Sequence, residues 1–149
     1  MEFQLILSFI ASLPFFKDFT GKEREALIQT QDLFLKFRAD QLIIREGEID
    51  DGLFIILKGV VQITKRNRPN KVLAQLRPGA LFGEVTLISK RARTTNATAQ
   101  GDVVVMKITQ EMIEKLSVEL QKKFHQQLVL QLVQRLEEMN EKLSQARND

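Results

Sequence analysis

Glu84 directly follows Gly83 and stands nine residues ahead of Arg93 in the stretch LFGEVTLISKRARTTNATA, residues 81–99. Glycine lets a ligand or another segment of backbone come close, because it has no side chain. Arginine carries a permanent charge and a planar fork of N–H donors, which suits an anion such as a phosphate. A carboxylate does not suit that anion, but it accepts a hydrogen bond from a neighbouring hydroxyl group. These residues therefore indicate a ligand with a phosphate beside a hydroxyl, as in a nucleotide.

Backbone amides and a hydroxyl add to this candidate site. If a short helical turn opens at Glu84, the amides of residues 83–86, that of Val85 included, point at the space before the turn, and helix starts of this kind bind anions. Thr94 supplies a hydroxyl donor next to Arg93. Arg91 offers a second register for the clamp, but its spacing of seven residues from Glu84 is short. We therefore favour Arg93 as the anion ligand.

Short strands are the elements that must hold this stretch. Between residues 33 and 108, runs rich in β-branched and aromatic residues alternate with glycine and proline, and Gly59 and Gly101 are among the glycines expected to punctuate the strands. Such spacing predicts an antiparallel barrel or sandwich. The runs are LFLKF, LIIRE, LFIILKG, VVQITKR, KVLAQL and VVVMKI.

Helical patterns stand on both sides of the strands. In residues 1–32, Thr20 and Glu23 form a T-x-x-E capping box that opens a helix. From residue 109 onward, Thr109 and Ser117 are expected to cap a short helix and a long one. Apolar residues in the long helix alternate spacings of three and four, which predicts a parallel homodimer through this helix. They are Val129, Leu132, Leu136, Met139, Leu143 and Ala146.

The composition excludes several classes of protein. The chain has 149 residues, of which 44% are hydrophobic and 28% charged, as in one globular domain. Its net charge of +3 comes from scattered cations, so we expect no nucleic-acid interface. The single histidine, His125, argues against a metal centre and against a metal-dependent enzyme on a β-roll. The absence of cysteine fits the cytoplasm, and no run approaches the ~18–20 apolar residues of a membrane span.

The stretch LRPGALFGEVTLISKRARTTNATA resembles the phosphate-binding cassette of cyclic nucleotide-binding domains. That cassette has the pattern G-E-x-(small)-L, followed by R-(small)-A about nine residues after the glutamate. The segments IIREGEIDDGLFIILKGVVQI and LPFFKDFTGKEREAL resemble the strand pair and the entry helices of the same family. The chain departs from the pattern at Ala92, where the family often has proline, and at Thr95, where alanine is usual.

The resemblance implies an α+β fold. An antiparallel β-roll, jelly-roll-like, would be flanked by N-terminal helices and by a long C-terminal lid helix. Residues 1–149 would form one domain, with helices in 1–32, the roll in 33–108, the cassette in 82–95 and helices again in 109–149.

The resemblance also implies that the roll binds cAMP or cGMP, without a further cofactor. Glu84 would accept from the ribose 2′-OH, Gly83 would donate its amide nearby, Arg93 would pair with the cyclic phosphate, and Thr94 would bond the phosphate or the base. Arg135, about forty residues after Arg93, would contact the base from the lid; its alternative is a solvated position on the helix. The implied ligand-binding residues are Gly83, Glu84, Val85, Arg93, Thr94, Thr95 and Arg135.

The expected function is that of a sensor without catalytic activity, in which the nucleotide repositions the C-terminal helix. Two alternatives stay open: a degenerate roll that binds a protein instead of a ligand, and the ligand-binding part of a larger transcription regulator or channel. Because no helix-turn-helix precedes Asp149, we do not expect these residues to bind DNA.

Overall fold

The computed structural model describes residues 3–29, 33–83 and 91–148. The N-terminal elements are α1 (Phe3–Ser12), the 3-10 turn η1 (Pro14–Phe16) and α2 (Gly21–Ile28). The strands are β1 (Phe34–Phe37), β2 (Leu42–Ile44), β3 (Leu53–Thr64), β4 (Ala74–Leu76), β5 (Leu81–Phe82) and β6 (Asn96–Ile108). The C-terminal elements are α4 (Gln110–Glu114) and α5 (Val118–Asn148).

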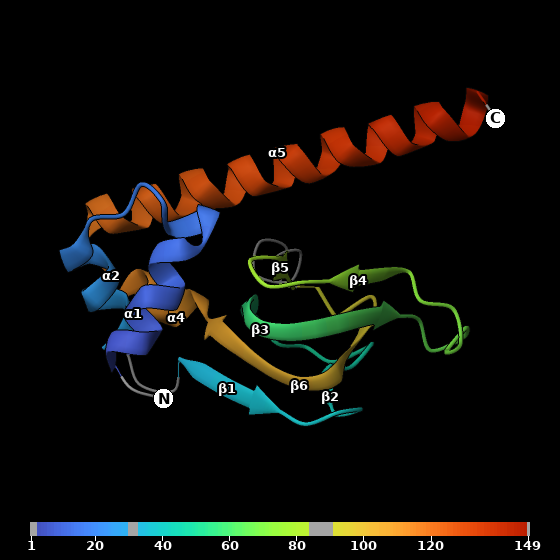
Figure 1. Cartoon of the computed structure of the whole chain (residues 1–149), viewed down its shortest axis with the longest axis horizontal. Coiled ribbons are helices and arrows are strands. Elements are labelled where there is room, and N and C mark those ends of the chain that lie inside the picture. The colour runs from blue at the N-terminus through green and yellow to red at the C-terminus, as the bar shows by residue number, and fades with distance from the viewer. Residues whose placement is uncertain (1–2, 30–32, 84–90, 149) are drawn as a thin grey trace.

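The two long strands, β3 and β6, form the centre of one antiparallel sheet. They pair from Leu53 opposite Ile108 to Thr64 opposite Asn96. Strands β1 and β2 pair with β6, while β4 and β5 pair with β3, so the sheet curls into a roll. Helices α1, α2 and α4 gather at one end of it (Figure 1). The predicted α+β fold, an antiparallel roll between helices with a long C-terminal helix, is confirmed.

The glycines within β3 and β6 correct one detail of the prediction. LFIILKG and VVQITKR form a single strand, in which the register shifts between Lys58 and Val60. Gly59 lies at this bulge with φ +91°, and a Cβ there would collide with the carbonyl of Asp102. Gly101 lies within β6 with φ +83°. The prediction that these glycines end strands was wrong, because a left-handed glycine bends a strand at a bulge and pairing resumes beyond it.

The predicted helix caps are present. The hydroxyl of Thr20 accepts from the Glu23 amide, and the Glu23 carboxylate accepts from the Thr20 amide, which completes the capping box. Thr109 and Ser117 each accept from the backbone amide three residues further on. These bonds satisfy amides that would otherwise have no partner at the helix start.

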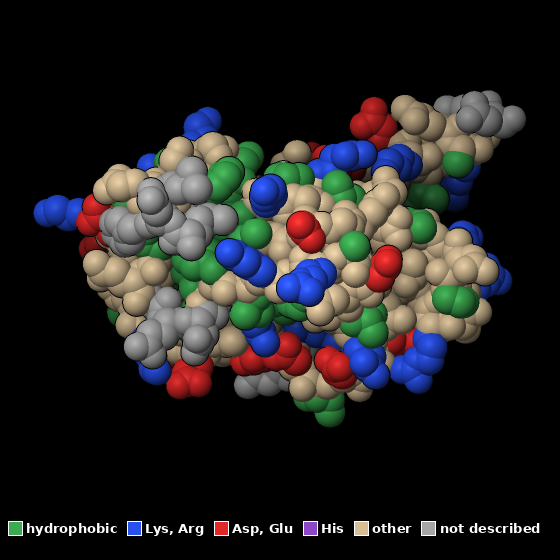
Figure 2. All heavy atoms as spheres, turned by 60° about the horizontal axis from the view of Figure 1, so that its bottom comes forward, with side chains coloured by type: hydrophobic (Ala, Val, Ile, Leu, Met, Phe, Trp, Pro, Cys, Tyr) green, Lys and Arg blue, Asp and Glu red, His purple; other side chains and the backbone are tan. Residues whose placement is uncertain are grey.

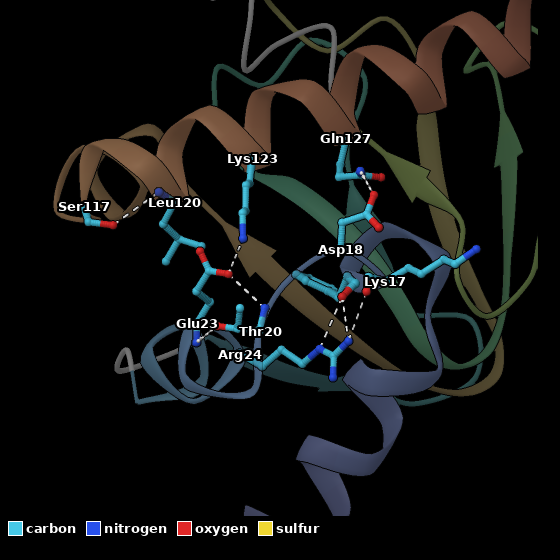
Figure 3. Close-up of polar contacts among 10 residues, drawn as sticks. Lys17, Asp18, Thr20, Glu23, Arg24, Ser117, Leu120, Lys123 and Gln127 are labelled. Carbon is cyan, nitrogen blue, oxygen red and sulfur yellow. Dashed lines mark hydrogen bonds and ion pairs between the residues drawn. The ribbon is translucent and has the colours of Figure 1, made fainter.

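The first half of α5 packs on the N-terminal helices. Phe15 and Phe124 are fully buried, and their rings meet edge to face with centroids 5.1 Å apart. Beside this apolar contact the Gln127 amide of α5 donates to Asp18 at 3.2 Å, and Lys123 donates to Glu23 (Figure 3). This part of α5 is therefore held in place by both packing and hydrogen bonds.

The second half of α5 runs over β5 and β4 and extends past the roll (Figure 1). Leu136, Met139 and Leu143 are more than half exposed on it. Among the described helices none is long and apolar enough to span a membrane.

The surface carries charges of both signs. On the face drawn in Figure 2, basic and acidic side chains are interspersed, and among the described residues no continuous field of one sign covers that face.

Candidate functional site

Arg93 is the only charged residue buried among those that the structure describes. Its Nη1 donates to the carbonyl of Gly83 at 2.9 Å and its Nη2 to the carbonyl of Gly52 at 2.6 Å. Its backbone is also held, because its amide donates to Glu48 and its carbonyl accepts from Gly47, both at 2.8 Å. The guanidinium has five N–H donors, and among the described residues these two carbonyls and the nearby Asp50 carboxylate use part of them, which leaves others for an anion.

Gly83 provides the close approach that the sequence predicts. Its φ is +84°, a conformation that favours glycine. A Cβ at this position would lie 2.8 Å from Arg93 Nη1 and 2.8 Å from the carbonyl oxygen of Gly52. Both distances are too short for real contacts, so this arrangement of Arg93 requires glycine at position 83.

A cavity of about 250 Å³ opens beside these residues. Its polar part contains Arg93, Thr94 and Thr95, and Arg135 reaches it from α5. A cavity of this size is at the small end of those that bind organic ligands. The combination of two arginines, two hydroxyls and an apolar wall suits a small anion joined to a flat or hydrophobic body. The remaining lining residues are Ile44, Ile63, Ala74, Leu76, Phe82 and Gly83.

Arg135 connects α5 to the edge of the cavity. Its Nη2 donates to the carbonyl of Leu81, which lies two residues before Gly83 in the chain. The side chain is half-buried, as expected where a helix crosses a pocket. The second half of α5 therefore lies over the site, while the first half is anchored on the N-terminal helices.

Asp50 places a carboxylate next to the buried guanidinium. Its Oδ2 lies 3.6 Å from Arg93 Nη2 and 3.1 Å from the ammonium of Lys107. Burial raises the pKa of Asp50, but the hydrogen bond and the charge of Lys107, together with the charge of Arg93, outweigh this and hold the pKa below its usual range. Burial lowers the pKa of Arg93, and Asp50 opposes that change. Arginine nevertheless keeps its charge at any physiological pH.

The structure brings together five of the residues proposed from the sequence. Gly83, Arg93, Thr94, Thr95 and Arg135 all line the one cavity, although Arg135 is distant from the others in the chain. Glu84 and Val85 lie outside the described residues.

Sequence reasoning missed Asp50, Lys107 and the apolar wall. Ile44 and Phe82 occur in runs that read only as strands, and nothing in their spacing distinguishes a residue that lines the cavity from one in the core. Asp50 stands in a loop segment, EIDDG, with three carboxylates close together in sequence, and only the fold selects one of them.

Residues 34–119 match the family model described as "Cyclic nucleotide-binding domain". A cGMP-dependent protein kinase of Eimeria tenella is 28% identical over 127 residues, which are 85% of this chain and 12% of the kinase. The chain therefore spans about an eighth of the length of that relative.

Two solved structures share the fold. A cyclic nucleotide-binding domain from Methylobacillus flagellatus superposes with a TM-score of 0.80 at 22% identity, and the match covers 97% of this chain and 83% of that one. The regulatory domain of Toxoplasma gondii PKA, crystallised with cAMP, gives a TM-score of 0.66 at 23% identity, over 85% of this chain and 49% of that one. The resemblance that the cassette motif indicates is confirmed at the level of family and fold.

Proposed function

The chain belongs to the cyclic nucleotide-binding domain family, and on that premise we propose that it binds cAMP or cGMP as a sensor without catalytic chemistry of its own. The observation that carries this proposal is the buried Arg93, which lines a cavity with two threonine hydroxyls and an apolar wall. A cyclic nucleotide has a phosphate with a single negative charge and an aromatic base, which suit the arginine with its hydroxyls and the apolar wall of this cavity.

Each residue has a distinct role in the proposed complex. Arg93 donates its remaining N–H groups to the cyclic phosphate, and Gly83 keeps the backbone close to it. Thr94 donates its hydroxyl to the phosphate or the base, with Thr95 beside it. Glu84 accepts from the ribose 2′-OH; this role rests on its position directly after Gly83 in the sequence.

The long helix α5 completes the proposed site as a lid. Arg135 lines the cavity and bonds the carbonyl of Leu81, which supports the proposal that it contacts the base of a bound nucleotide. A ligand that contacts the closed position of α5 better than other positions shifts the helix toward it. Hydrogen exchange of residues 118–140 should therefore slow when nucleotide binds, and equal exchange with and without bound nucleotide would contradict the lid.

Calorimetric titration of nucleotide-stripped protein with cAMP and with cGMP tests binding and the preferred base. Arg93→Lys keeps a charge but loses the two-pronged donor, and Arg93→Ala removes both; we expect the alanine variant to lose about a hundredfold in affinity. Arg91→Ala is the matched control, because Arg91 is exposed two residues before Arg93 and represents the competing register.

The outcomes distinguish a nucleotide-binding site from a ligand-free roll. Binding that disappears in Arg93→Ala and persists in Arg91→Ala supports the proposal, provided that circular dichroism shows both variants folded. No heat and no thermal stabilisation with either nucleotide would contradict it and leave a ligand-free roll that acts through protein contacts.

A further inference from the structure

Two cations share one carboxylate beneath the cavity. Asp50 Oδ2 lies 3.1 Å from Lys107 Nζ and 3.6 Å from Arg93 Nη2, so the lysine is the nearer partner. Both cations also stand over the ring of Phe54, at 5.7 Å for Lys107 and 5.9 Å for Arg93 from its centroid. The three charged groups and the ring therefore form one compact cluster.

The strand register builds this cluster. Lys107 of β6 stands opposite Phe54 of β3, and Phe54 stands opposite Phe82 of β5. The rings of Phe54 and Phe82 stack with centroids 5.0 Å apart, and Phe82 lines the cavity. Lys107 is thus one strand away from the cavity and does not line it itself.

Gly52 lets the lysine side chain lie close to the clamp. A Cβ on Gly52 would come within 2.5 Å of Lys107 Cε, and the carbonyl of the same residue accepts from Arg93. The Gly52 amide donates to Asp50 Oδ1 at 3.3 Å. Gly52 therefore contacts all three charged groups. Its lack of a side chain leaves room for Lys107, its amide donates to Asp50 and its carbonyl accepts from Arg93.

The charge of the cluster depends on Lys107. Arg93 and Asp50 alone would sum to zero, and a neutral pair attracts an anion weakly. With Lys107 these three groups sum to +1, which favours the single negative charge of a phosphodiester; Asp51 and Glu48 also act on Arg93 by charge, less strongly than Asp50. Attraction of this kind is strengthened in partly buried sites, where solvent screens less.

We infer that Lys107 is a positioning residue for the anion clamp: it holds Asp50 away from full pairing with Arg93 and keeps the cluster at +1. This inference rests on the proposed binding of a cyclic nucleotide. It assigns Asp50 the opposite effect, since its carboxylate reduces the attraction of Arg93 for a phosphate.

A three-variant cycle tests the inference, with cAMP and cGMP titrated into the full chain at low and at high salt. Lys107→Met is expected to weaken nucleotide binding by about three- to tenfold, more at low salt, and Asp50→Asn to strengthen it by a similar factor. The double variant Lys107→Met with Asp50→Asn returns the cluster to +1, so its affinity should return close to that of the unchanged protein. Lys107→Arg should restore binding by restoring the charge.

Lys36→Met is the matched control, because Lys36 is exposed on β1 and its loss changes the net charge of the chain equally. If Lys107→Met binds as tightly as the unchanged protein, the inference is wrong. It is equally wrong if the double variant stays as weak as Lys107→Met, because Lys107 would then act only through packing. If the unchanged protein binds neither nucleotide, the proposed function itself fails, and the inference with it.

Discussion

Lys123 of α5 donates a hydrogen bond of 2.6 Å to Glu23 of α2, across one hundred residues of sequence. The same carboxylate accepts from the Thr20 amide in the capping box. Glu23 therefore accepts one hydrogen bond from its own helix start and one from a distant segment of the chain (Figure 3). The bond ties the anchored half of α5 to the N-terminal helices, beside the buried Phe124.

We expect Glu23→Gln to destabilise the fold by about 1 kcal/mol at neutral pH. The hydrogen bond from Lys123, followed by that from the Thr20 amide, holds the pKa of Glu23 below its ordinary value. A lowered pKa in the folded state stabilises the protein above the unfolded pKa, and this stability is lost as the pH falls through the folded value. Urea unfolding should therefore show a difference between the two proteins at pH 7 that shrinks below about pH 4.

Lys123→Met provides the control for this prediction. In a double-mutant cycle with Glu23→Gln, the two effects should not add, because each substitution removes the same bond. Additive effects, or a difference that does not shrink at all as the pH falls, would show that the bond contributes nothing to stability.

Gly83→Ala should both destabilise the fold and weaken nucleotide binding. Its Cβ would meet Arg93 and the carbonyl of Gly52 at 2.8 Å, and its φ of +84° disfavours alanine. Gly101→Ala is a matched control, since Gly101 has φ +83° but no atom within 4 Å of a Cβ. We expect a loss of about 1 kcal/mol from backbone strain in the control and about 2–3 kcal/mol in Gly83→Ala.

Thermal unfolding and nucleotide titration of both variants measure these effects. Only Gly83→Ala should lose affinity, because only its Cβ displaces the clamp. Equal stability and equal affinity of the two alanine variants would contradict the close approach at Gly83.

Arg135→Met should weaken nucleotide binding and speed hydrogen exchange in the half of α5 that follows residue 129. The substitution keeps an apolar stem but removes the donor to the Leu81 carbonyl and the charge at the cavity. We expect a loss of about tenfold or more in affinity, the effect of one charged hydrogen bond. Lys142→Met, at an exposed position further along α5, should change neither quantity. Unchanged binding in Arg135→Met would place this residue outside the site.

The exposed stripe on α5 leads us to propose a parallel homodimer. Leu136, Met139 and Leu143 are 59%, 54% and 62% exposed, and their spacing is that of a coiled-coil seam. Sedimentation at micromolar concentration should give a dimer for the unchanged protein and a monomer for Leu136→Glu. Gln134→Glu adds the same charge off the stripe and should leave the dimer intact. A monomeric unchanged protein, with and without nucleotide, would remove this proposal.

The sequence alone determined the local structure and the family. The capping box at Thr20 and Glu23 and the cap at Thr109 depend on residues three positions apart, so short-range pattern is sufficient to predict them. The cassette motif likewise spans few residues, and it predicts Gly83 and Arg93 as site residues without their contact in the structure.

Only the tertiary structure decided what surrounds that clamp. Lys107 meets Asp50 because β3 and β6 pair in one register, and a shift by one residue would turn its side chain to the other face of the sheet. The bulge at Gly59 and the position of Arg135 over Leu81 have the same origin. Contacts between segments distant in sequence are set by strand register and helix packing, which no short stretch of this chain encodes by itself.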